Sequence, residues 1–172
     1  LADHGNGYYG YVDDEAEAKR IFVKQMGATV LTIAKDVKLQ LEFNPQWVKE
    51  YKLVGYENRI LEAEDFANDK KDAGELGGGS SVTALYEITL YESPHTDLKV
   101  ENKNEKLQYA TFGNNDILAL NIRYKDPKED KSKLITAMVQ DASVTPEKTS
   151  TDFKFSAAVA MAGMYLKDAK NK

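Results

Sequence analysis

Apolar and polar residues alternate along several short stretches, a pattern typical of β-strands with one buried and one solvent-facing side. The alternation predicts strands at 37–43, 48–56, 82–90, 118–124 and 134–139, and a weaker one at 107–111. In the first strand we expect Lys38 and its polar alternates to face solvent. Only a short link through Asn44 and Pro45 separates the first two strands, which predicts that they form an antiparallel pair.

An amphipathic helix is predicted near the N-terminus, at about 14–26, because apolar residues recur there at helical spacing. Asp13 or Asp14 can cap its start, and Glu17 stands three residues after Asp14, as in a capping box. Gly27 is a suitable terminator because glycine adopts the left-handed conformation freely.

A second helix is predicted at about 151–169, capped by Ser150 or Thr151. It is apolar around almost its whole circumference, and one small sheet covers only one stripe of such a helix. The remaining surface indicates a protein partner or an oligomer; the alternative is a helix of small residues whose alanine face tolerates exposure. The candidate interaction residues are Ala157, Met161, Met164 and Tyr165.

The order of these elements predicts a mainly β, or α+β, fold. Several strands between two terminal helices, without a βαβ rhythm, favour an antiparallel, β-sandwich-like core. The stretch 57–80 is expected to be a long connection with a short helical turn near 62–67.

Composition narrows the chemistry. The chain has 172 residues, of which 42% are hydrophobic and 30% charged, and its net charge is −5. The acidic balance disfavours nucleic-acid binding. The absence of cysteine excludes disulfides and thiolate metal sites, and two histidines exclude a multi-histidine metal centre. The longest apolar run, 155–166, is shorter than a membrane span, so no direct membrane insertion is expected.

An acidic stretch at 62–75 is the main candidate for chemistry. Paired carboxylates bind calcium or perform acid–base catalysis, so a metal-binding or hydrolytic module is one hypothesis. Lys70 and Lys71 lower the local charge, and no calcium-loop spacing is present, which favours a solvated loop. The weak metal candidates are Glu64, Asp65, Asp69 and Asp72.

Other motifs carry less weight. The Asp-x-Ser-x-Thr pattern at 141–145 follows an apolar strand, but too little chain follows it to supply the remaining metal ligands. The glycine-rich stretch 74–81 lacks the adjacent lysine of a phosphate loop and is expected to be a flexible entry to the next strand. His95 belongs to no catalytic grouping visible in the sequence, and Trp47 is expected to pack rather than bind ligand.

Several segments together resemble a known family. They are LTIAKDVKLQLEFNP (31–45), YKLVGYENR (51–59), DKKDAGEL (69–76), VTALYE (82–87), IRYKDP (122–127) and DFKFSAAVA (152–160). They are similar to the C-terminal region of bacterial von Willebrand factor A-type domain proteins of the YfbK group. That region has no known function, so the resemblance supplies no catalytic residue.

The resemblance also implies a domain organisation. Segment 5–13 and the helix 14–26 look like the last strand and last helix of the A-type domain. Residues 1–27 are thus expected to be the tail of that domain, and 28–172 a sandwich-like C-terminal domain. The metal-coordinating loops of the A-type domain, with any divalent cation, would precede residue 1. No cofactor is expected in this chain.

By the same resemblance we expect a bacterial cell-envelope or secreted protein with a noncatalytic binding or scaffolding role. The expected partner is a protein, including the A-type domain itself. The arrangement resembles the hybrid domain of integrins, in which the last helix of the A-type domain transmits ligand state. By fold-level analogy, helix 14–26 is either a mechanical coupler or a static connector.

Overall fold

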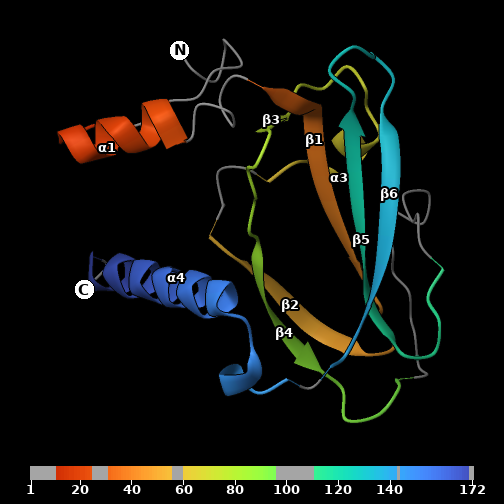
Figure 1. Cartoon of the computed structure of the whole chain (residues 1–172). Helices are drawn as coiled ribbons and strands as arrows, with labels where there is room; N and C mark the ends of the chain where they lie inside the picture. Colours follow the sequence, from red (N-terminus) through yellow and green to blue (C-terminus); the bar gives the residue numbers. More distant parts are fainter. Residues whose placement is uncertain (1–10, 25–30, 56–59, 96–110, 143, 171–172) are drawn as a thin grey trace. The chain divides into compact units, whose positions relative to one another are not determined.

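The computed structural model describes residues 11–24, 31–55, 60–95, 111–142 and 144–170 (Figure 1). The chain forms two compact units. Unit 1 comprises 1–40, 62–82 and 120–137, and unit 2 comprises 41–61, 83–119 and 138–172.

Two antiparallel sheets dominate the described chain. The four-stranded sheet has the order β3-β1-β5-β6, and β2 pairs antiparallel with β4 in a second sheet. The strands are β1 (Thr32–Phe43), β2 (Val48–Val54), β3 (Gly74–Gly77), β4 (Leu85–Leu90), β5 (Asp116–Lys125) and β6 (Lys133–Gln140). The predicted mainly β, α+β class is confirmed, while the face-to-face packing of two sheets stays a prediction.

The helices are short except at the C-terminus. They are α1 (Glu15–Lys19), the π-helix η2 (Arg20–Lys24), α3 (Ala63–Phe66), the 3₁₀ turn η5 (Pro146–Lys148) and α4 (Thr151–Lys170). The Asp14 carboxylate accepts a hydrogen bond from the Glu17 N–H at 2.7 Å, so Asp14 is the N-cap of α1, one of the two predicted candidates. The predicted helix end at 26–27 lies outside the described residues.

A hairpin joins β5 to β6, and Figure 1 shows β6 running back along β5 at the margin of the sheet. The turn is held by Lys133, whose ammonium pairs with the carboxylates of Asp126 and Glu129. The predicted strands at 118–124 and 134–139 are confirmed with slightly wider bounds.

The predicted pairing of the first two strands is wrong, because β1 neighbours β3 and β5 while β2 pairs with β4. The cause is Asn44, which is 2% exposed. Its backbone N–H donates to the Ile117 carbonyl at 2.7 Å and its side-chain amide to the Asp116 carbonyl at 2.7 Å. The chain is therefore tied to the start of β5 where β1 ends, and Val48 pairs with Leu90 instead.

Two further boundaries differ from the prediction. Within 57–80, the residues Gly74–Gly77 form β3 against β1 rather than a flexible entry to the next strand, and that next strand, β4, begins only at Leu85. The short helical turn expected near 62–67 is confirmed as α3. Of the weak strand at 107–111, only Thr111 is described, and it lies outside any strand.

The predicted solvent-facing side of β1 is wrong as well, and in β5 two residues that alternate with the large apolar positions are buried. Lys38 is 4% exposed, and Ala119 and Asn121 are fully buried, whereas Leu39 is 42% exposed. In unit 1 the connection 62–73 supplies partners to Lys38 from the side of the sheet expected to be wet. The buried apolar residues of the described chain are Ile21, Ala34 and Phe66 in unit 1, and Val48, Ile117 and Ala119 in unit 2.

Candidate functional site

Helix α4 is the main candidate for a binding surface. The Ser150 hydroxyl accepts a hydrogen bond from the Phe153 N–H at 3.1 Å, so Ser150 caps the helix. Lys154 donates to the Glu147 carbonyl at 2.8 Å, which fixes the first turn against η5. The start of the helix is thus positioned by local polar contacts.

The large apolar side chains of α4 are exposed. The exposed fraction is 71% at Phe155, 66% at Met161, 43% at Met164, 76% at Tyr165 and 67% at Leu166. The predicted candidates Met161, Met164 and Tyr165 therefore lie on the surface, while Ala157 is half-buried. Monomeric proteins seldom leave so many large apolar side chains of one element uncovered, because contact with water costs free energy.

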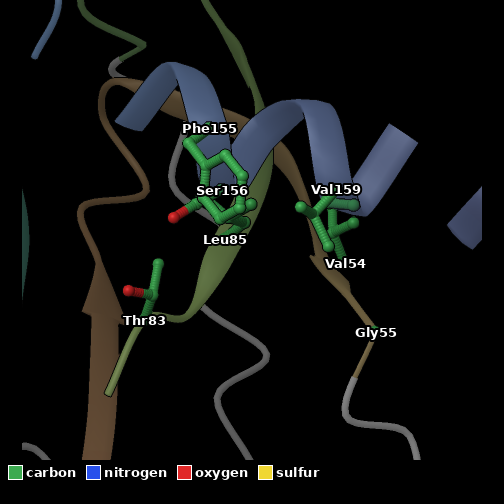
Figure 2. A pocket seen from close by; sticks show the side chains of 8 residues that line it. Val54, Gly55, Thr83, Leu85, Phe155, Ser156 and Val159 are labelled. Atoms are coloured by element: carbon green, nitrogen blue, oxygen red, sulfur yellow. The ribbon is translucent and has the colours of Figure 1, made fainter. Parts of the chain in front are cut away.

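The first half of α4 lies beside the second sheet within unit 2. Figure 2 shows Phe155 and Val159 projecting toward Leu85 and Val54. Between helix and strands lies an open groove of about 370 Å³, lined mainly by apolar groups. The helix therefore faces the β2–β4 sheet through Phe155 and Val159, which are still 71% and 56% exposed. The helical spacing of Met161, Met164 and Tyr165 puts them on other sides of the helix.

The acidic connection 62–73 is fastened to the sheet of unit 1 by lysines. The Lys38 ammonium donates to the Asn68 carbonyl at 2.6 Å and to the Asp65 carbonyl at 3.1 Å. Burial lowers the pKa of Lys38, against the nearby Asp36 carboxylate, which raises it. Lys38 therefore tolerates burial because two carbonyls of the connection solvate its ammonium.

A second lysine links the same connection to β1. The Lys125 ammonium donates to the Asp36 carboxylate and to the Asp69 carbonyl, each at 2.7 Å. Asp36 has a positive φ of 50° and also accepts from the Ala73 N–H at 3.1 Å. Burial alone would raise the pKa of Asp36, but the bonds from Lys125 and Ala73 outweigh it, and the pKa lies below its ordinary value.

The carboxylate of Asp69 faces the β5–β6 hairpin. It accepts a short hydrogen bond from the Ser132 hydroxyl and lies 3.5 Å from the Arg123 guanidinium. The Ser132 bond is the main reason that the pKa of Asp69 lies below its usual range. Arg123 also donates to Ser132 at 2.7 Å and lies over the Phe66 ring. Arg123 therefore contacts both the hairpin and the first part of the connection.

The side chains of the four metal candidates do not converge on a common site. Asp65 pairs with Lys71 at 3.0 Å, Asp69 pairs as described, and Glu64 and Asp72 are exposed. Within the described residues, no group of three or more His, Asp or Glu side chains is arranged to hold a metal ion. Burial, with the charges of Asp36 and Asp72, raises the pKa of Glu75, a separate perturbation at the edge strand β3.

The remaining sequence candidates occupy structural positions in unit 2. Trp47 donates from its indole to the Asn114 carbonyl at 2.7 Å, and the His95 ring stacks on Tyr91 at 4.7 Å. Ser143 of the 141–145 motif lies outside the described residues. Sequence reasoning missed Lys38 and Lys125. The alternation placed Lys38 on the polar side of its strand, and Lys125 directly follows the predicted strand 118–124, so neither lysine carried a local signal of its role.

No described helix is long and apolar enough to cross a membrane. These features define a β-rich domain with a loop fastened by ion pairs and a terminal helix whose apolar residues are exposed. The chain belongs to the family described as "Uncharacterized protein YfbK, C-terminal", whose model matches residues 28–172.

A relative supports this assignment. The chain is 37% identical over 170 residues to "Uncharacterized protein YfbK" of Escherichia coli (strain K12). The match covers 99% of the chain and 29% of the relative, so the chain spans less than a third of that protein's length. No solved structure matches the chain. The predicted family is thus confirmed.

Proposed function

We propose that this chain is a noncatalytic binding or scaffolding module that holds a protein partner through α4. The observation that carries the proposal is the exposure of the large apolar side chains along the helix, from 43% at Met164 to 76% at Tyr165. Burial of such side chains is the main favourable term in protein association. The stable capped start of α4 presents them on a regular element rather than on a loop.

The proposed partner is an A-type domain, which the family resemblance leads us to expect upstream in the same polypeptide. In this proposal any divalent cation belongs to that domain, the present module needs no cofactor, and the parent protein works in the bacterial cell envelope. The support for a separate, cation-free role comes from the acidic connection, where Lys38, Lys125 and Arg123 already engage its carbonyls and carboxylates.

A binding experiment with matched variants tests the proposal. The chain is immobilised, and the purified A-type domain is passed over it. Leu166→Ser removes a side chain that is 67% exposed on α4, and Ile60→Ser removes one that is 68% exposed elsewhere in unit 2. We expect Leu166→Ser to weaken binding about tenfold, in the range of a moderate interface contact, and Ile60→Ser to leave it unchanged.

Two outcomes would contradict the proposal, and a third would support the alternative function. If the wild-type chain fails to bind the A-type domain, or if both variants weaken binding equally, α4 is not the docking surface. Hydrolase activity of the purified chain that disappears in Asp69→Asn would instead support the metal-binding or hydrolytic alternative based on 62–75.

A further inference from the structure

The two edges of the four-stranded sheet differ in a way that points to an interaction. At one edge β3 is only four residues long and carries Glu75, and short charged edge strands resist pairing with other chains. At the other edge, β6 has eight residues. In the sheet order β6 comes last, and among the described residues no strand pairs with the side of β6 that faces away from β5.

Strand β6 lacks the usual protection of an edge. All eight of its residues are exposed, and its large apolar side chains Leu134, Ile135, Met138 and Val139 are 39–49% exposed. Between Lys133 and Asp141 there is no charge, proline or glycine. An exposed edge with seven consecutive uncharged residues, 134–140, is a ready template for another strand. Its presence indicates that the outer side is covered in the working protein.

The sequence of β6 matches itself in the antiparallel direction. A two-fold axis perpendicular to the sheet at Ala137 places Ala137 opposite its own copy. In that register Ile135 lies opposite Val139 of the second copy, and Lys133 lies opposite Asp141 of the second copy. Directly opposite residues of an antiparallel pair share one face. The register therefore joins apolar to apolar and cation to anion on that face.

We propose that β6 pairs antiparallel with β6 of a second copy of this chain, joining two four-stranded sheets into one of eight strands. The self-matching charge pattern favours a second copy over an unrelated strand. Lys133 already pairs with Asp126 and, at 3.3 Å, with Glu129, but its side chain is 46% exposed and an ammonium has three donors, so a third contact is compatible with these two. The proposal is independent of α4 and of the proposed function.

Engineered cysteines test the register, because the full chain contains no natural cysteine. In Ala137→Cys the two thiols face each other with Cβ atoms about 4.5–5.5 Å apart, so a mild oxidant joins two chains by a disulfide. In the control Leu134→Cys the two thiols are about 20 Å apart along the strands. We expect at least about tenfold more crosslinked dimer for Ala137→Cys on a non-reducing gel.

A charge exchange provides a second readout that does not depend on oxidation. Sedimentation of the wild-type chain should give a concentration-dependent mass that approaches twice 19.2 kDa. Ile135→Lys and Val139→Glu should each weaken the dimer at least about tenfold, since each buries an unpaired charge. The double variant should restore it, because the introduced lysine of one chain meets the introduced glutamate of the other only in this register.

Three results would overturn the proposal. A mass of 19.2 kDa at every concentration, with equal crosslinking of the two cysteine variants, excludes the dimer. A dimer that neither charged variant weakens uses another surface. Loss of the dimer without rescue in the double variant shows that β6 pairs with a different register or with a different strand.

Discussion

Replacement of Lys38 by methionine tests the account of the acidic connection most severely. Lys38 is 4% exposed and donates to the Asp65 carbonyl at 3.1 Å and the Asn68 carbonyl at 2.6 Å. Methionine has a similar length and volume but no donor. The substitution therefore removes both bonds without leaving a cavity.

The size of the effect follows from opposing terms. A hydrogen bond from a charged donor contributes about 1.5–3 kcal/mol, so two bonds represent roughly 3–6 kcal/mol. Part of this is offset, because methionine avoids the free energy cost of burying the Lys38 ammonium, and water can reach the released carbonyl of the exposed residue Asn68. We expect a net loss of about 1–3 kcal/mol in the free energy of unfolding.

Urea unfolding followed by far-UV circular dichroism measures the change, with amide hydrogen exchange over 62–73 as the local readout. The control is Lys49→Met, which changes an exposed lysine on β2 and should alter stability by less than about 0.5 kcal/mol. If Lys38→Met lies within that range and exchange over 62–73 is unchanged, the connection is not fastened by Lys38.

The pH dependence of the stability difference between wild type and Lys38→Met provides a further test. The pKa of Lys38 is lowered in the folded state, chiefly by burial. Between the folded and unfolded pKa values the unfolded chain binds more protons, so stability rises with pH. The stability difference between wild type and Lys38→Met should therefore widen as pH rises from 7 toward 10. The contributions of all other titratable groups cancel in this difference, because both proteins contain them. A narrowing difference would contradict the assignment.

Three further outcomes are expected. Asn44→Ala removes the buried amide that bonds to the Asp116 carbonyl and should lower the free energy of unfolding by about 1–3 kcal/mol, measured by chemical denaturation. A loss below about 0.5 kcal/mol would contradict the role of Asn44 in holding the end of β1 to the start of β5. Ser150→Ala removes the cap of α4 and should cost about 1 kcal/mol, seen as faster amide exchange in its first turn, whereas unchanged exchange would refute the cap. Micromolar calcium or magnesium should leave the melting temperature unchanged, and a rise would reveal a cation site in this chain.

The fold class and most of its strands could be predicted because period-two alternation is a local property of the sequence. The π-helix η2 could not, since its residues have ordinary helical composition. The β1–β2 pairing was wrong for a tertiary reason. The buried Asn44 amide and N–H bond to residues more than seventy positions away, and no local turn signal reveals such partners.

The candidate site was predictable only in part. Exposed Met161 and Tyr165 follow from the all-round apolar pattern of the helix. The sequence pattern predicted that Lys38 faces solvent. The prediction failed because strand alternation carries no information about a distant connection that covers that side of the strand. The ion pairs of Asp36 and Asp69 likewise depend on strands that come together only in the folded sheet.

Amide hydrogen exchange of α4 tests the central claim, that this module works by binding protein through the exposed side of its terminal helix. The peptide 151–170 is compared between the isolated chain and a polypeptide that joins it to the proposed A-type domain. The account predicts markedly slower exchange across α4 in the longer polypeptide, with β2 as the internal reference that stays unchanged. Identical exchange of α4 in both proteins would contradict it.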